Sequence, residues 1–209
     1  MPSDARKYAL LLVAVLSFLF ARPLGAQDRS LLRYGVEWGL SASVYNSFHY
    51  NYIDGIMGYR IDEEGSDTDC IGNAFAEVYC GTDLSRRLSL TLRAGFSGIA
   101  RGRRVVPICL RLSWFPAGTC ADGFFTLADG GLSFPDFFEA KPAPVFRLGG
   151  GYRLLLTDSS SLDIQLCARL CQDHPDIWDE QERHYVETHN VRRSDAAHYA
   201  LCLSAALNF

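Results

Sequence analysis

Residues 199–209 read YALCLSAALNF, and this stretch decides the fold. Tyr199, Leu201, Leu203, Leu207 and Phe209 fall at alternate positions, with small or polar residues at most of the positions between them. A period of two puts the large apolar side chains on one face of an extended strand, whereas a helix needs a period near 3.6. The stretch therefore predicts a β-strand with one apolar face and one polar face.

The same alternation recurs in seven earlier segments. They are residues 34–44, 73–82, 88–97, 106–114, 124–134, 146–156 and 162–171. Segment 124–134 is ambiguous in phase because Asp129-Gly130-Gly131 interrupts it, and Pro107 suggests a bulge or a local irregularity. The segments are close to the ~9–11 residues of a tilted transmembrane strand. We therefore predict an all-β protein, an eight-stranded antiparallel up-and-down transmembrane β-barrel.

The connectors between these segments alternate in length. Residues 83–86, 115–122 and 157–160 are short or moderate, whereas residues 48–71 and 172–195 are long. Consecutive connectors of an up-and-down barrel lie at opposite ends, so the long ones share one end and both termini share the other. Outer-membrane barrels have this asymmetry, with short periplasmic turns and longer extracellular loops. The pattern predicts periplasmic termini and places loops 48–71 and 172–195 where an extracellular partner would bind.

The N-terminus carries a targeting signal. Arg6 and Lys7 precede the apolar stretch from Tyr8 to Phe20, and small residues follow up to Ala26. This order is typical of a cleaved secretory signal peptide, and the apolar stretch is too short for a membrane-spanning helix. We expect a signal peptide over residues 1–26 and a single barrel domain over residues 27–209. The net charge of −4 over 209 residues gives no basic footprint for nucleic acid.

The charged residues of the polar faces favour a membrane barrel over a soluble one. Alternation alone also fits a secreted lipocalin-like barrel, which turns its leucines inward. The polar faces, however, are mostly Gly, Ser and Thr with scattered charges, which suits a narrow lumen better than a water-facing surface. We predict a lumen charge network of Glu37, Glu77, Arg93, Arg111, Asp129, Arg147, Arg153, Asp163 and Arg169. Turning its five arginines toward lipid would cost on the order of 10 kcal/mol.

With these features, residues 33–209 resemble the small eight-stranded outer-membrane barrels of the OmpA transmembrane-domain and OmpX type. The most specific part is the end of the chain, where Tyr199, Leu201, Leu203, Leu207 and Phe209 are similar to the C-terminal insertion signal of such barrels. The resemblance implies a Gram-negative outer membrane, contact with its lipids, and assembly by the outer-membrane barrel assembly machinery. It implies no shared activity. The seven cysteines depart from the family pattern.

No catalytic, metal or cofactor site is predicted. Ser194, Asp195 and His198 are a weak triad candidate, because no nucleophile elbow or known catalytic spacing accompanies them. The histidines of loop 172–195 (His174, His184 and His189) lie among acidic residues, as expected for a solvated loop. The acidic run 62–69 lacks the terminal Glu of a calcium loop. Both are therefore read as solvated loops.

Three of the cysteines share the predicted polar face near the C-terminus. Cys167 and Cys171 lie about 13 Å apart on one strand, too far to bridge each other. Either is a possible partner for Cys202 on the neighbouring strand, although packing of free thiols in the lumen is favoured. Metal binding by these thiols is not expected, because no CxxC spacing is present.

The expected role is structural or a surface interaction through the long loops, without enzymatic activity. A side-chain-filled lumen of eight strands is too narrow for a general diffusion pore. The competing hypotheses are a lipid-modifying outer-membrane enzyme and a secreted lipocalin-like ligand-binding barrel.

Overall fold

The computed structural model describes residues 32–55, 58–100, 103–135, 141–179 and 184–209. The predicted signal peptide, residues 1–26, therefore lies outside the described residues. Residues 32–209 form one compact unit. No helix in the described part of the chain is long and apolar enough to cross a membrane.

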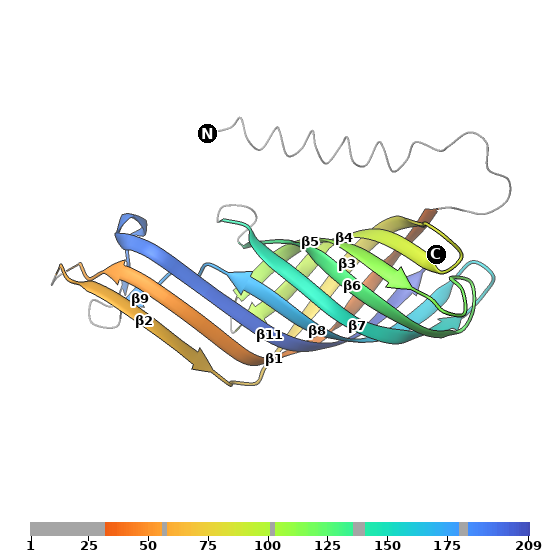
Figure 1. Cartoon of the computed structure of the whole chain (residues 1–209), viewed down its shortest axis with the longest axis horizontal. Coiled ribbons are helices and arrows are strands. Elements are labelled where there is room, and N and C mark those ends of the chain that lie inside the picture. Colours follow the sequence, from red (N-terminus) through yellow and green to blue (C-terminus); the bar gives the residue numbers. More distant parts are fainter. Residues whose placement is uncertain (1–31, 56–57, 101–102, 136–140, 180–183) are drawn as a thin grey trace, which may run out of the picture. The chain divides into compact units, whose positions relative to one another are not determined.

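Nearly all regular structure in the described ranges is β-strand (Figure 1). The elements are β1 (Leu32–Ile53), β2 (Arg60–Asp67), β3 (Ile71–Asp83), β4 (Leu88–Ala100), β5 (Arg103–Trp114), β6 (Gly123–Pro135), β7 (Ala143–Leu155), β8 (Ser161–Asp173), β9 (Trp178–Asp179), β10 (His184–Tyr185), the 3-10 helix η2 (Thr188–Asn190) and β11 (Val191–Asn208).

Antiparallel pairing runs in chain order around the sheet and closes on itself. β3 to β7 each pair with the next strand in sequence, β8 pairs with β11, and β11 returns to pair with β1 through contacts such as Val36 opposite Leu207. β2 and β3 pair with successive parts of β1, so together they form one strand position of the barrel. The predicted eight-stranded antiparallel up-and-down barrel is confirmed.

The leucine-rich faces point outward and the charged faces point inward. Leu40, Leu148 and Leu166 are 67%, 68% and 61% exposed, whereas Glu37 and Arg111 are 1% and 3% exposed. A soluble lipocalin-like barrel requires the opposite arrangement, so that hypothesis is wrong.

The structure settles the two irregularities that the sequence raised, at segment 124–134 and at Pro107. In β6, Phe125 and Leu127 point inward and Phe124 is 76% exposed, which settles the phase of segment 124–134. At Pro107 the register of β4 against β5 is unchanged, although the pairing is interrupted there, because proline has no N–H to donate. The predicted local irregularity is therefore present, while the register shift of these strands lies at Gly98.

Glycine permits close strand approach in the lumen. A Cβ atom at Gly149 would overlap the backbone of Leu166 and Cys167 on the neighbouring β8. The run Gly149–Gly151 therefore relieves crowding on the inward face of β7, as expected for a strongly curved small barrel.

The prediction of loops over residues 48–71 and 172–195 was wrong in part. β1 continues to Ile53, pairs with β2 on one side and with β11 on the other, and so extends beyond the ends of the other strands (Figure 1). We call residues 46–53, 60–67 and 191–198 the outer extension. Most of its residues are exposed or half-buried whichever face they occupy, so its strands need no strict hydrophobic alternation. Phe48 packs on Gly65 and stacks with Tyr50 at 4.9 Å, which supports the paired backbones.

Candidate functional site

Three arginines from different strands surround Glu37 at the centre of the lumen. Arg93 donates a hydrogen bond to Glu37 Oε2, and Arg111 Nη1 donates to the same oxygen at 2.9 Å. Arg147 Nη1 lies 3.8 Å from Glu37 Oε1, which also accepts a hydrogen bond from Ser204 Oγ at 2.9 Å. Glu37 therefore links strands β1, β4, β5 and β11 directly through its carboxylate.

A second set of contacts extends this centre around the barrel wall. Arg111, Asp129 and Arg147 lie directly opposite one another on β5, β6 and β7. Arg111 binds Asp129 through two hydrogen bonds of 2.6 and 2.8 Å, and Arg147 Nε lies 2.7 Å from Asp129 Oδ2. Glu77 accepts hydrogen bonds from Arg93 Nε at 3.1 Å and Arg147 Nη2 at 2.7 Å. Positive and negative groups alternate, so each of these buried charges has an opposite partner.

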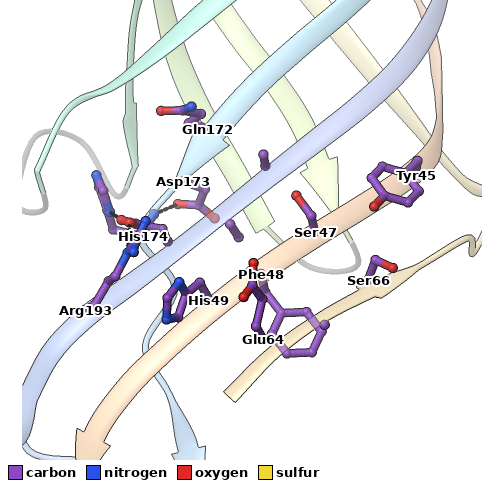
Figure 2. A pocket seen from close by; sticks show the side chains of 14 residues that line it. Tyr45, Ser47, Phe48, His49, Glu64, Ser66, Gln172, Asp173, His174 and Arg193 are labelled. Carbon is purple, nitrogen blue, oxygen red and sulfur yellow. Dashed lines mark hydrogen bonds and ion pairs between the residues drawn. The ribbon is translucent and has the colours of Figure 1, made fainter. Parts of the chain in front are cut away.

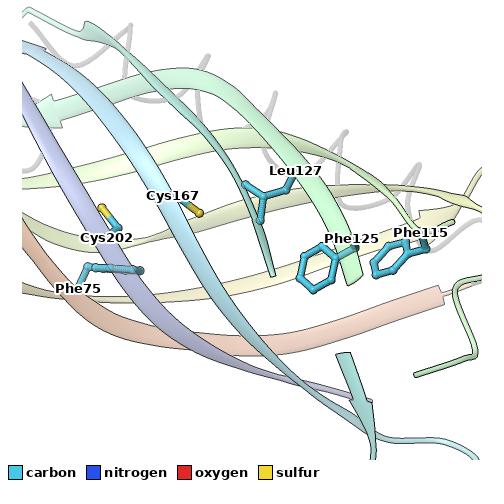
Figure 3. Close-up of a cluster of buried hydrophobic side chains, with 6 residues drawn as sticks. All are labelled: Phe75, Phe115, Phe125, Leu127, Cys167 and Cys202. Carbon is cyan, nitrogen blue, oxygen red and sulfur yellow. The ribbon is translucent and has the colours of Figure 1, made fainter. Parts of the chain in front are cut away.

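A separate ion pair lies toward the end of the barrel that holds the termini. Arg153 binds Asp163 through hydrogen bonds of 2.7 and 2.6 Å, and its Nη1 donates to the Thr119 carbonyl at 2.8 Å. The guanidinium lies 4.2 Å from the centre of the Phe115 ring, which stacks on Phe125 (Figure 3). The β5–β6 connector is thereby tied into the lumen and fills this end of the barrel.

Arg169 is the one arginine of the predicted network that contacts no carboxylate among the described residues. It is 6% exposed and donates to Ser97 Oγ, to Ser41 Oγ at 3.1 Å and to the Gly98 carbonyl at 3.0 Å. The nine predicted residues comprise five guanidinium groups and four carboxylates, so Arg169 holds the excess positive charge. The structure brings the other eight into ion pairs.

Several neutral partners of the charges were not predicted from the sequence. Gln165 accepts a hydrogen bond from Arg111 Nη1 at 2.7 Å. The Tyr79 ring lies 4.4 Å from the Arg93 guanidinium carbon, and its hydroxyl donates to Asn208 at 2.8 Å. These residues stand at the alternate positions that point inward, and this position in the pattern was the signal that could have identified them.

The network leaves little free space in the lumen. The cavity beside Arg93, Arg111 and Arg153 has a volume of about 20 Å³. This is slightly more than the ~10–15 Å³ of accessible space that one water molecule needs, so the cavity has room for about one water molecule. Apolar side chains and thiols spread along the barrel also fill the lumen (Figure 3).

The triad candidate is not assembled. His198 Nδ1 hydrogen-bonds Asn46 at 2.8 Å, while Ser194 Oγ donates to the Pro175 carbonyl. Asp195 contacts Arg193 at 2.6 Å and His174 at 3.1 Å instead of His198. These contacts supply no nucleophile–base–carboxylate chain.

Metal ligands and disulfides are likewise not assembled in the described ranges. Within them, no three His, Cys, Asp or Glu side chains are grouped so that they could hold a metal ion. All seven cysteines are described and all are free. Cys167 lies directly opposite Cys202 in the β8–β11 register, and both thiols are buried in the lumen.

A larger hollow lies at the outer end of the barrel. This rim groove has a volume of about 520 Å³ and is formed by β1, β2, β11, the end of β8 and His174 (Figure 2). Tyr45, His49, Glu64, His174 and Arg193 contribute to its lining. Beside it, His49 Nε2 lies 2.8 Å from Asp62 Oδ1, and this hydrogen bond lowers the pKa of the Asp62 carboxyl.

Comparisons with known proteins give no sequence match and several structural ones. No family model and no curated protein matches the chain. The solved structure of outer membrane protein OprG from Pseudomonas aeruginosa is similar with a TM-score of 0.47 and 9% identity, over 85% of this chain and 95% of that one. Outer membrane protease OmpT from Escherichia coli has a TM-score of 0.40 and 6% identity, over 88% and 99%. Outer membrane protein AlkL has a TM-score of 0.40 and 13% identity, over 91% and 97%.

Proposed function

We propose that this chain is an outer-membrane β-barrel protein that has no open diffusion pore and acts through surface contacts of its outer extension. Both termini are then periplasmic, and the outer extension and rim groove face the outside of the cell. The proposal includes no cofactor and no catalytic role, in keeping with the separation of Ser194, Asp195 and His198.

The single observation that carries the proposal is the outward direction of the large apolar side chains. Val78, Leu110, Leu148, Leu166 and Leu203 are each between 53% and 68% exposed, on five different strands. A soluble monomer rarely exposes so continuous an apolar surface. Lipid chains would cover it, while every inward guanidinium stays away from the hydrocarbon, where it would cost about 2–4 kcal/mol at mid-depth.

Aromatic side chains at both ends of this apolar surface support a membrane-spanning band. Tyr34 stacks with Phe209 at 5.9 Å near the termini, and Tyr45 contacts Tyr199 at 5.6 Å near the outer end. Aromatic rings of membrane barrels favour the two membrane–water boundaries. The paired positions indicate where those boundaries lie on β1 and β11.

Membrane fractionation tests the location. We expect the protein in the outer-membrane fraction, with gel migration that changes on heating because the closed barrel resists detergent until it unfolds. Recovery in the aqueous fraction would overturn the proposal. For orientation, an epitope placed at Gly58 should be labelled on intact cells, whereas the same epitope at Ser159 should be labelled only after permeabilisation.

The filled lumen supports the absence of a diffusion pore. Glu37 and its arginines occupy the centre of the lumen, and the cavity next to them has a volume of about 20 Å³. In planar bilayers we therefore expect no steady conductance from the reconstituted protein. A stable open current of porin size would contradict this part of the proposal.

The outer extension supports the surface role. β2 pairs with β1 and with no other strand of the described chain, so its second edge presents backbone hydrogen-bonding groups. It carries Asp62, Glu63, Glu64 and Asp67 against Arg60, so a basic extended segment is the complementary partner. Charge reversal at Glu63 and Glu64 should weaken partner capture by intact cells, and unchanged capture would exclude this edge.

For assembly, we propose recognition of the last strand by the barrel assembly machinery. Phe209 and Leu203 are 48% and 57% exposed on the outward face, as an insertion signal requires. Phe209→Ala should reduce the amount of heat-modifiable barrel in the membrane at equal expression. An unchanged amount of barrel would show that Phe209 is not part of the insertion signal.

A further inference from the structure

The rim groove opens on the outward face of the barrel, just beyond the apolar exterior. Tyr45, at its lower edge, pairs with Tyr199 of β11, and Leu201, the next outward residue of β11, is 53% exposed. Beyond Tyr45 the sheet continues as the outer extension. In the proposed orientation, the groove is therefore open to molecules outside the membrane.

Polar side chains from three strands surround the groove on this outward face. Ser47 and His49 of β1 follow the edge residue at intervals of two, so they point the same way, and their partners on β2 are Ser66 and Glu64. Gln172, near the end of β8, lies opposite the β11 residue that also faces Ser47. The register therefore places two hydroxyls, a carboxylate and an amide around one hollow (Figure 2).

Most charged groups of the groove already have partners inside the protein. His49 binds Asp62 at 2.8 Å, and Asp195 contacts Arg193 at 2.6 Å and His174 at 3.1 Å. Four lining side chains, in contrast, make no hydrogen bond or ion pair within the described part of the chain: Ser47, Glu64, Ser66 and Gln172. Their donors and acceptors are available to a ligand.

We propose that the rim groove binds a neutral oligosaccharide outside the cell. Sugar hydroxyls donate hydrogen bonds to the Glu64 carboxylate and exchange them with the serine and glutamine side chains. The C–H face of one sugar ring packs on Tyr45, which is 40% exposed although its ring also contacts β11. This inference rests on the proposed surface orientation, and it deepens the proposed surface role by naming a class of ligand.

The composition of the groove favours a neutral sugar over a charged ligand. Asp195 is paired with Arg193, and Asp173 is paired with Arg103 at 2.9 Å. Glu64 is then the one lining carboxylate without a cationic partner among the described residues, and its charge disfavours an acidic saccharide. A single ammonium group would satisfy Glu64 but leave the neighbouring hydroxyl and amide groups unused. The volume of about 520 Å³ lies within the usual range of small-ligand sites.

Glycan binding by the purified barrel tests the proposal. The mature protein in detergent micelles would be applied to an array of short neutral oligosaccharides, built from hexose and N-acetylhexosamine units, with sialylated and sulfated chains beside them. We expect saturable binding to a subset of the neutral chains and weaker binding to the acidic ones. Binding to none of the neutral chains, or stronger binding to the acidic ones, would overturn the proposal.

Two groove variants and a matched control identify the site. For the neutral chain bound most strongly, Glu64→Ala should weaken binding at least about tenfold, as for loss of a hydrogen bond to a charged group. Gln172→Ala should weaken it about threefold, as for loss of a neutral hydrogen bond. Asp69 is an exposed carboxylate just after β2 that does not line the groove, so Asp69→Ala should leave binding unchanged. Equal affinity of E64A and wild type, both folded by heat-modifiable migration, would refute the site.

A lipid anchor on the same glycan distinguishes the source of the sugar. The chain free in solution and the chain attached to a lipid in vesicles should bind equally, because the groove begins beyond the apolar exterior. Binding that requires the anchor would place the recognised part in the lipid and contradict the proposal.

Labelling of the epitope at Gly58 separates this inference from the proposed function. Labelled cells whose purified barrel binds no neutral glycan refute the sugar site alone. A barrel that binds the glycan in detergent but is absent from the outer-membrane fraction refutes the proposed location and leaves the sugar site standing.

Discussion

The substitution Glu37→Gln tests the lumen network at its centre. Glu37 is 1% exposed and contacts Arg93, Arg111 and Ser204 directly. The amide keeps the shape but removes one of the four carboxylates of the lumen network, which leaves its five guanidinium groups against three carboxylates. Breaking a buried ion pair by neutralising one partner costs about 3–5 kcal/mol. This is a large part of the ~5–15 kcal/mol that stabilises an ordinary domain.

Reversible urea unfolding of the barrel in lipid vesicles, followed by tryptophan fluorescence, measures this free energy. We expect Glu37→Gln to lower the free energy of unfolding by about 3 kcal/mol or more at neutral pH. Glu63→Gln removes the same charge from the exposed β2 and should change it by no more than about 0.5 kcal/mol. In a double-mutant cycle, Arg111→Met should lower the free energy of unfolding less in E37Q than in wild type. A change below about 0.5 kcal/mol for E37Q would refute the reasoning.

Three further predictions address the exterior, Arg169 and the outer extension. Leu148→Arg turns a charge toward lipid and should lower the unfolding free energy in vesicles by about 2–4 kcal/mol. Ser97→Asp gives Arg169 a carboxylate and should raise it by about 1 kcal/mol at neutral pH, a gain lost as the pH falls through the pKa of the new carboxyl. The His49 hydrogen bond lowers the pKa of Asp62, so any stability it confers is present above the ordinary pKa and lost as the pH falls through the lowered one. In His49→Ala, carboxyl NMR titration should show the pKa of Asp62 raised.

Each of these predictions has an outcome that contradicts it. Leu148→Arg without effect would mean that lipid does not contact β7 there. Ser133→Asp also buries a carboxylate, on the inward face of β6 without a guanidinium contact, so it should destabilise the barrel. If S133D and S97D behave alike, Arg169 is not the source of the gain. An unchanged pKa of Asp62 in His49→Ala would show that the His49 contact does not lower this pKa.

The barrel was predictable because its outward and inward faces have opposite polarity, which alternate residues express. Leu166 and Gln165 illustrate this, since one residue step changes exposure from 61% to 2%. That constraint weakens beyond Tyr45, where most residues are exposed or half-buried on either face of the sheet. The strands of the outer extension therefore carry no strict alternation, and sequence reasoning assigned them to loops.

The sequence predicted which residues point into the lumen, but it did not predict which of them form ion pairs with one another. Parity predicts that Glu37 and Arg111 both point inward, but they lie on β1 and β5 and meet across the barrel. Such contacts depend on the stagger of the strands, which alternation does not specify. For the same reason, the sequence did not reveal that Arg169 meets hydroxyl groups and a carbonyl instead of a carboxylate.

Fluorescence quenching of Trp38 tests the direction of the apolar face most directly. Trp38 lies on the outward face of β1 and is 49% exposed, while Trp178 is 50% exposed in β9, beyond the apolar band. In vesicles of lipids brominated along the acyl chain, the account predicts strong quenching of a variant that retains Trp38 alone. A variant that retains Trp178 alone should be quenched by aqueous acrylamide instead. Trp38 fluorescence that is unaffected by brominated chains and quenched by acrylamide would contradict the account.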